Sequence, residues 1–144
     1  MVSLSNLRPA TIADASAINL LSDSLGYLSG SDEDLASRLE LLIDSDRDEV
    51  WLAENGLNIV GWIHFFQANR VASASFVEIG GLVVKPDFRN RGIGKSLIEQ
   101  ASLWASAKNL KLRVRTDSRR EEAHSFYVSA GFNKLKNQHV FELK

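Results

Sequence analysis

The residues with the clearest chemical potential form the short turn RNRGIGK, which runs from Arg89 to Lys95. Two glycines, Gly92 and Gly94, stand among two arginines and a lysine. The periodic apolar pattern that follows predicts a helix, and the first turn of a helix carries unpaired N–H groups and the positive end of the dipole. Glycines let an anion approach the backbone, so the turn is a candidate phosphate site. A plain turn with solvated basic side chains has the same composition, and the turn alone leaves both interpretations open.

Two common nucleotide motifs do not fit this turn. The sequence GKS at 94–96 resembles the end of a P-loop, but that motif requires a glycine where Arg89 stands. A dinucleotide fingerprint requires a third glycine where Leu97 stands. Neither of these two nucleotide-binding motifs therefore fits the turn.

Two other side chains have the chemistry for proton transfer. Glu78 is a lone carboxylate within the apolar run SFVEIGGLVV, where a buried charge is costly without partners. Its alternatives are a solvent-facing strand end or electrostatic binding of a substrate. Tyr127 lies in HSFYVSAGF and shares a helical face with Ala123 and Phe126, so a core role is its alternative.

Helix and strand patterns alternate along the elements that must position these residues. Apolar runs predict strands, apolar residues three to four apart predict helices, and Asn55-Gly56 predicts a tight hairpin. The chain order is a strand at 4–8, helices at 15–25 and 35–43 capped by Thr11 and Ser31, hairpin strands within 50–66, a strand at 75–84, a helix at 93–104, a strand at 110–116, a helix at 123–130 and a strand at 135–143. The order β-α-α-β-β-β-α-β-α-β predicts a mixed α/β (α+β) sheet rather than a strict βαβ repeat.

Two local details accompany these elements. The pair Gly80-Gly81 interrupts a strand, and glycines there mark a bulge, simple curvature of the sheet or close approach by another chain or ligand. Ser118 and Glu121 predict a capping box at the start of the last helix.

Length and composition bound the class of protein. The 144 residues, 44% hydrophobic and 24% charged, suit a single globular domain spanning 1–144. A net charge of -1 and a basic segment without interleaved aromatics argue against nucleic-acid binding. No apolar run approaches the roughly 20 residues of a membrane helix, and the N-terminus lacks a secretion-signal pattern, so we expect a soluble, cytoplasmic protein. Three scattered histidines and no cysteine predict no metal site.

The pattern R-x-x-G-x-G at Arg89, Gly92 and Gly94 resembles the pyrophosphate-binding turn of the GNAT superfamily of acyl-CoA-dependent N-acetyltransferases. VEIGGLVVKPDFRNRGIGKSLIE resembles the central strand, turn and helix of that family, and REEAHSFYVSAGF resembles its last helix. The element order is similar as well, so the resemblance covers nearly the whole chain. It implies a GNAT-like fold in which four helices flank a mixed, mostly antiparallel sheet of six to seven strands.

The resemblance implies an N-acetyltransferase that moves an acetyl group from acetyl-CoA to a primary amine by direct attack in a ternary complex. It places the pyrophosphate of coenzyme A on Arg89, Asn90, Arg91, Gly92, Ile93, Gly94 and Lys95. It pairs the pantetheine arm with the backbone around Leu82, Val83 and Val84. Glu78 would accept the amine proton or bind the amine, and Tyr127 would contact the donor and protonate the departing thiolate. Many relatives have an asparagine near the start of the last helix, where Asp117 and Arg120 stand here, which leaves that pantetheine contact without its usual residue.

The acceptor is less defined, and a small-molecule amine and a protein amine both fit. In the family, the first two helices and their loop shape the acceptor pocket, and this loop offers Tyr27. The hairpin adds Trp62 and His64, and the following strand adds Glu78, which completes the predicted substrate-binding residues. His64 fits a satisfied, half-buried histidine equally well. The acids at 32–34 would favour a cationic amine or simply be first-turn acids of a helix. The resemblance also makes a homodimer through the last strand an option. The alternative function is a non-catalytic acyl-CoA binding or sensing domain.

Overall fold

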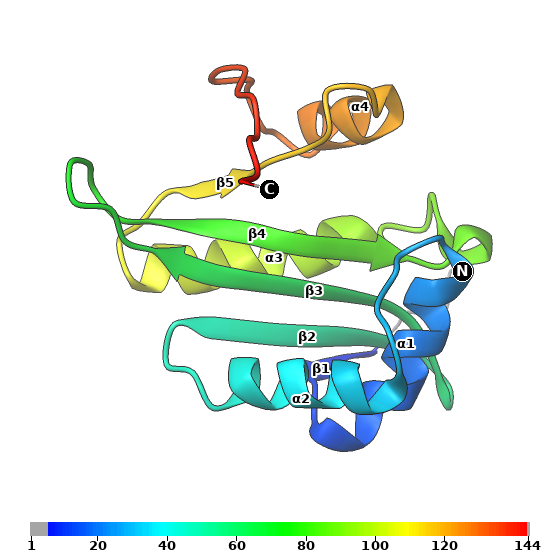
Figure 1. Cartoon of the computed structure of the whole chain (residues 1–144). Coiled ribbons are helices and arrows are strands. Elements are labelled where there is room, and N and C mark those ends of the chain that lie inside the picture. Colours follow the sequence, from blue (N-terminus) through cyan, green and yellow to red (C-terminus); the bar gives the residue numbers. More distant parts are fainter. Residues whose placement is uncertain (1–5, 144) are drawn as a thin grey trace. The chain divides into compact units, whose positions relative to one another are not determined.

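The computed structural model describes residues 6–143, which form two compact units that divide after Val114. The first unit contains a five-stranded sheet and three α-helices, and the second contains one helix and an extended segment (Figure 1). The expectation that 1–144 is a single domain stays a prediction.

The sheet has the strand order β1-β2-β3-β4-β5. The bounds are β1 (Asn6–Pro9), β2 (Asp48–Asn55), β3 (Asn58–Ala68), β4 (Phe76–Val84) and β5 (Leu112–Val114). Neighbours are antiparallel except β4 and β5, which are parallel. The prediction of a mixed, mostly antiparallel sheet is therefore confirmed, but that of six to seven strands is wrong, because residues 6–143 form five. In the predicted first strand, residues 4 and 5 lie outside the described part of the chain.

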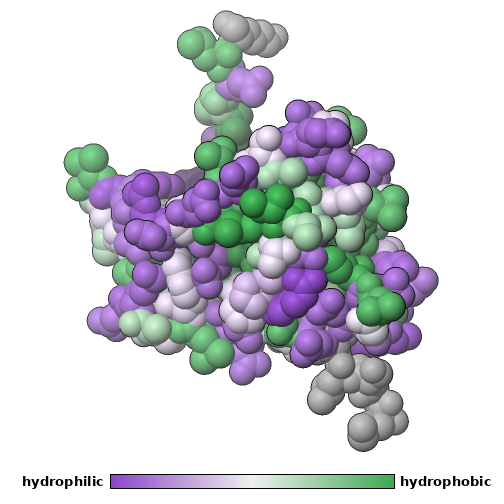
Figure 2. All heavy atoms as spheres, turned by 90° about the horizontal axis from the view of Figure 1, so that it is seen from below, coloured by the Kyte–Doolittle hydropathy of each residue, from purple (hydrophilic) through white to green (hydrophobic). Residues whose placement is uncertain are grey.

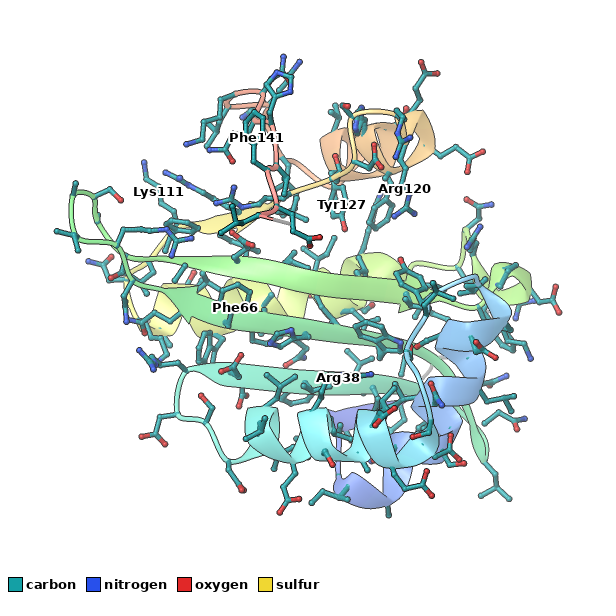
Figure 3. All side chains as sticks on the ribbon, in the orientation of Figure 1. Arg38, Phe66, Lys111, Arg120, Tyr127 and Phe141 are labelled. Carbon is teal, nitrogen blue, oxygen red and sulfur yellow. The ribbon has the colours of Figure 1, made fainter. Side chains whose placement is uncertain are left out.

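The predicted last strand accounts for part of this difference. Residues 132–143 contain neither helix nor strand. A strand requires a neighbouring strand for its backbone groups, and no other segment in the described chain pairs with this one. Three of its large apolar side chains are almost fully exposed, with Val140 at 95%, Phe141 at 91% and Leu143 at 98% (Phe141 is labelled in Figure 3).

Four α-helices occur in the described residues, as predicted. Their bounds are α1 (Ala15–Ser24), α2 (Asp32–Ile43), α3 (Ile93–Ala107) and α4 (Glu121–Ser129). Ser31 caps α2 as predicted, because its hydroxyl accepts the N–H of Asp34 at 3.0 Å. The capping box predicted for α4 is wrong. The residue before that helix is Arg120, and no side chain caps its first turn.

The helices of the first unit cover the two faces of the sheet (Figure 1). On one face, α3 packs against β3, and the rings of Phe65 and Trp104 lie 5.4 Å apart. On the other face, α1 and α2 bury Ile18 and Leu39 against Leu52 of β2. Strand β3 therefore has one face toward α3 and the other toward α1, and β4 also packs against α3.

The surface of the protein is mostly hydrophilic on the face drawn in Figure 2. Figure 2 shows one face of the molecule, where hydrophilic side chains dominate around a patch of hydrophobic ones. The exposed apolar residues of the helices include Leu20 on α1 and Leu41 on α2, at 75% and 73% exposure. Scattered exposure of this kind is common on soluble proteins and indicates no site by itself.

Candidate functional site

Strand β4 loses one of its two neighbours at Gly80. Up to Ile79 it pairs with β3 on one side and β5 on the other, with Ile79 opposite Val114. From Gly80 to Val84 it pairs with β3 alone, so within the described residues no strand covers its second edge. Backbone N–H and C=O groups on such an edge can pair with an extended ligand. The strand edge around Leu82, where the pantetheine arm is expected to pair, is therefore open, and its occupation by a ligand stays a prediction.

The open edge begins at a β-bulge. The register between β3 and β4 shifts after His64, which leaves Gly80 as the extra residue. A Cβ atom on Gly80 would lie 2.7 Å from Nδ1 of His64, and one on Gly81 would lie 2.7 Å from ring carbons of Trp62. These distances are shorter than real Cβ contacts, so a larger residue at either position would force the ring of His64 or Trp62 to shift. The predicted bulge is confirmed, and the close approach comes from side chains of β3.

The chain passes from β4 through a short 3-10 turn (Pro86–Phe88) into the glycine turn and α3. Gly92 precedes the helix with φ 83° and ψ 4°, a left-handed conformation that favours glycine. No side chain caps the helix, and Asn90 in the same turn has a positive φ of 62°. The first helical bond runs from the N–H of Ser96 to the carbonyl of Gly92 at 2.9 Å, so the preceding N–H groups have no acceptor in the helix.

Basic side chains surround this uncapped start. The guanidinium of Arg91 lies 4.8 Å from the ring centroid of Phe88, and the ammonium of Lys85 lies 5.9 Å from the same centroid. Arg89 donates from Nε to the carbonyl of Val84 at 3.3 Å. An uncapped helix start with several cations suits a phosphate group. Lys85 was missed by the sequence analysis, although its position between a strand and Pro86 marks the same turn.

Trp62, His64 and Glu78 lie on one face of β3 and β4. Glu78 is half-buried and pairs across the ladder with Phe66, and residues that pair in a sheet point to the same side. Trp62 donates from its indole N–H to Oγ of Ser22 on α1 at 3.0 Å. The structure therefore brings together three of the four predicted acceptor residues.

The fourth, Tyr27, follows α1. Its backbone N–H donates to the carbonyl of Ser22 at 3.1 Å, and its side chain is exposed. Ser22 thus contacts Tyr27 through its backbone and Trp62 through its hydroxyl. This serine is 1% exposed, which fixes the end of α1 against β3.

His64 is a satisfied, half-buried histidine, one of the two alternatives considered from sequence. Its Nε2 lies 2.8 Å from Oδ1 of Asp48 on β2. The sequence analysis missed Asp48, because only the pairing of β2 with β3 brings the two residues together.

A second group missed from sequence surrounds Phe76, near Glu78. The guanidinium of Arg113 lies 4.4 Å from the Phe76 ring centroid and that of Arg70 lies 5.5 Å from it. Arg113 stands opposite Glu78 in the β4–β5 register. The face therefore carries both signs of charge.

The acids at the start of α2 serve the fold. Asp32 accepts from Ser16 at 2.8 Å and from Asn19 at 2.8 Å, and these hydrogen bonds, led by that from Asn19, lower the pKa of Asp32. Asp34 completes the capping box with Ser31. A shallow hollow beside Asp32 is lined also by Ser16, Asn19, Leu20 and Asp23. The interpretation of residues 32–34 as first-turn acids is confirmed.

In the second unit, Tyr127 belongs to α4 (Figure 3). It is half-buried, and its ring lies 5.2 Å from that of Phe126 and 5.6 Å from that of Phe132, both in edge-to-face geometry. The helix ends at Ser129, and Gly131 in the turn that follows has φ 103°. This environment supports the aromatic packing considered for Tyr127 and leaves its proton-transfer role as a prediction.

Comparisons with known proteins define the family. The sequence model of the acetyltransferase (GNAT) domain matches residues 46–134, which is more than half of the chain. An uncharacterized N-acetyltransferase of Archaeoglobus fulgidus is 33% identical over 107 residues, which cover 67% of each chain. The chain therefore belongs to the GNAT acetyltransferase family, and the prediction that it is an acyltransferase enzyme is confirmed at that level.

Solved structures confirm the fold. An aminoglycoside N-acetyltransferase in complex with CoA superposes with a TM-score of 0.87 at 18% identity and covers 100% of this chain and 97% of its own. An aminoglycoside antibiotic 6'-N-acetyltransferase from Acinetobacter baumannii superposes with a TM-score of 0.85 at 18% identity, over 97% of this chain and 98% of its own. In the part of the chain that the structure describes, no helix is long and apolar enough to cross a membrane. Within residues 6–143, no three His, Asp or Glu side chains gather in a way that could hold a metal ion.

Proposed function

We propose that this chain transfers an acetyl group from acetyl-CoA to a primary amine by direct attack in a ternary complex. The observation that carries the proposal is the open edge of β4 from Gly80 to Val84, followed directly by the uncapped start of α3. The first feature suits an extended arm with amide groups, and the second suits a pyrophosphate. Coenzyme A contains both groups in this order. Membership in the GNAT family and the CoA complex of a structural relative support the same donor.

The donor is held mainly by backbone atoms in this proposal. N–H groups of Ile93, Gly94 and Lys95 bind the pyrophosphate, while Arg89 and Arg91 balance its charge. Asn90 lies between these two arginines in the proposed pyrophosphate-binding turn. The pantetheine amides pair with the backbone of Leu82, Val83 and Val84. Backbone recognition of this kind depends on the conformation of the turn more than on any single side chain.

The chemistry needs three proton-handling or charge-stabilising groups. An alkyl ammonium has a pKa of about 10.4 and must lose a proton before it attacks a thioester. The tetrahedral intermediate carries negative charge on oxygen, for which an N–H on the open edge of β4 is the proposed donor. Glu78 accepts the amine proton or holds the ammonium. Tyr127 protonates the thiolate, a role that rests on its place in the sequence motif. The chain contains no cysteine, so no thiol is present to form an acetyl-enzyme.

The proposed acceptor is a small molecule with a primary amine. The two structural relatives are named for aminoglycoside substrates, which are polyamines, although their low identity supports the fold alone. Glu78 and Asp48 place carboxylates on the face that also carries Trp62 and His64, and carboxylates favour a cationic acceptor. Tyr27 is the proposed contribution of the α1–α2 loop.

The first experiment is a calorimetric titration of the full chain with acetyl-CoA and with desulfo-CoA. We expect both to bind, because the proposed contacts do not involve the sulfur. If neither acetyl-CoA nor desulfo-CoA binds, the proposal is overturned. A thiol-release assay with an aminoglycoside, a polyamine and a lysine peptide then tests the reaction, and turnover of the peptide alone would overturn the small-molecule acceptor.

Two variants test the assigned side chains. Tyr127→Phe should lower kcat by about 100-fold, the lower range for a lost general acid, without weakening acetyl-CoA binding. Glu78→Gln should lower kcat if the carboxylate accepts the proton and raise the acceptor KM if it binds the ammonium. Unchanged kcat and KM in either variant would remove that residue from the mechanism.

A further inference from the structure

His64 and Asp48 form a polar pair beside the bulge of β4. Nε2 of His64 lies 2.8 Å from Oδ1 of Asp48, and the two side chains are only 20% and 18% exposed. A carboxylate accepts hydrogen bonds, so Nε2 carries the imidazole proton and donates a hydrogen bond to Asp48. In the neutral imidazole this fixes the tautomer and leaves the lone pair on Nδ1.

Gly80 lies beside the Nδ1 edge of the imidazole. Among the described residues, Nδ1 of His64 makes no hydrogen bond. A Cβ on Gly80 would lie 2.7 Å from Nδ1 and 3.1 Å from Cε1, so a side chain at position 80 would crowd this edge of the imidazole. The ring of Phe66 stacks on the imidazole, with centroids 5.4 Å apart and an interplanar angle of 24° (Phe66 is labelled on β3 in Figure 3). The Asp48 bond and the Phe66 ring together hold the imidazole in one orientation.

The pair stands where the proposed reaction would occur. Gly80 is the first residue of the open edge of β4, and Gly81 is the ladder partner of His64. A thioester at the end of an arm that lies along 82–84 would come close to this bulge. Glu78 lies on the same face and pairs with Phe66, two ladder pairs from His64 and Gly81.

We propose that His64, oriented by Asp48, is the general base that removes the proton from the acceptor amine. The inference rests on the proposed function and deepens it. His64 acts as the catalytic residue and Asp48 as a positioning residue that also stabilises the imidazolium. Glu78 then binds the ammonium and leaves the proton to His64.

The proton and bond balance is complete. The ammonium R–NH3+ gives one proton to Nδ1 of His64, and the freed nitrogen lone pair attacks the carbonyl carbon of the thioester. The C–N bond forms, and the C–S bond breaks as the tetrahedral intermediate collapses. The second proton lost by the nitrogen goes to the thiolate sulfur, and the imidazolium returns its proton to water.

The kinetic test compares His64→Gln and Asp48→Asn with the wild type in the thiol-release assay, using the amine that the wild type acetylates fastest. His139→Gln is the matched control, because His139 is an exposed histidine in the extended segment. We expect His64→Gln to lower kcat by about 100-fold or more and Asp48→Asn to lower it by about tenfold. Calorimetric affinity for acetyl-CoA should stay unchanged in both variants, and the control should match the wild type.

A second acceptor separates proton removal from a structural role. This second acceptor is a hydrazide with the same carbon skeleton as the amine. It is neutral at pH 7 and needs no base before attack, so His64→Gln should lower kcat only a few-fold with the hydrazide. If His64→Gln lowers kcat equally with the amine and with the hydrazide, His64 is not the base. A kcat of His64→Gln within twofold of the wild type with the amine would also overturn this role. In these outcomes wild-type turnover leaves the proposed function intact. No thiol release by the wild type from any amine would instead overturn the proposed function and this role together.

A spectroscopic readout tests the geometry without an acceptor. Nitrogen-15 spectra of the full chain, assigned with the His64→Gln variant, should show the neutral imidazole of His64 protonated at Nε2. Asp48→Asn should lower the population of this tautomer. A neutral His64 protonated at Nδ1 in the wild type would overturn the proposal.

Discussion

Gly92 gives the sharpest test of the donor site. Its φ of 83° is left-handed, and a Cβ placed on it would meet no atom within 4 Å. Gly92→Ala therefore adds no clash within the protein, but it adds the strain of a left-handed L-residue, about 1–2 kcal/mol. The new methyl group also stands beside the N–H groups to which a phosphate would bind. We expect this methyl group, by keeping a phosphate away from those N–H groups, to weaken the affinity for CoA about tenfold or more, which corresponds to about 1.4 kcal/mol of binding free energy.

The hairpin between β2 and β3 offers a matched control. Gly56 also has a positive φ, 64°, and a Cβ on it would also meet no atom within 4 Å. Gly56→Ala should cost a similar 1–2 kcal/mol or so of unfolding free energy without any effect on CoA affinity.

Two measurements on each variant separate strain from binding. Denaturant unfolding, followed by the fluorescence of the three tryptophans, gives the loss of stability, and calorimetry with CoA gives the affinity. If Gly92→Ala binds CoA within twofold of the wild type while both variants lose similar stability, the turn is only a helix start, and the phosphate assignment fails.

Three further substitutions test the scaffold. Arg8→Met removes a bidentate partner of Asp14, 2.7 and 2.8 Å away, and should cost about 2 kcal/mol at pH 7, less than a fully buried pair because Arg8 is partly exposed. The hydrogen bond from Arg8 lowers the pKa of Asp14 in the folded protein. The stabilisation by this pair is therefore fully present above the carboxyl pKa of the unfolded chain and is lost as the pH falls through the lowered pKa of the folded protein. An equal loss of unfolding free energy in Arg8→Met at pH 7 and at pH 2 would contradict this. Gly61→Ala puts a Cβ 2.9 Å from the backbone oxygen of Val83 and should cost about 1–3 kcal/mol in urea unfolding, whereas a neutral result would mean that the two strands can move apart. Ser31→Ala removes the cap of α2 and should lower the unfolding free energy by about 1 kcal/mol, and an unchanged midpoint would show that the capping bond contributes nothing net.

Local patterns predicted much of this fold. The Asn55-Gly56 turn, the helix cap at Ser31 and the bulge at Gly80 each depend on residues close in sequence, and each is present. The glycine turn before α3 was found in the same way, because its composition and the helix pattern after it are adjacent. What each of these features binds could not be read from the same information.

Features that depend on distant partners were predicted poorly. The alternating segment near Val140 has strand-like composition, but a strand exists only where another strand completes its hydrogen bonds. The strand around Arg113 is short for the same reason, because its ladder with β4 ends at Ile79. The pair of His64 and Asp48 spans 16 residues and depends on the β2–β3 register, which the sequence does not display. The acids at 32–34 were ambiguous until their hydrogen bonds were known.

The single-sided pairing of β4 has a consequence for amide hydrogen exchange. In a strand with only one neighbour, every second N–H points away from the ladder, so protection along 80–84 should alternate from one residue to the next. Amides bonded to β3 should exchange slowly, and those between them should exchange at rates set by local access to water. An acetyl-CoA molecule bound along this edge would slow exchange only at the amides that point away from β3. The alternation itself, and its disappearance on addition of CoA, would then report residue by residue which backbone groups the ligand contacts.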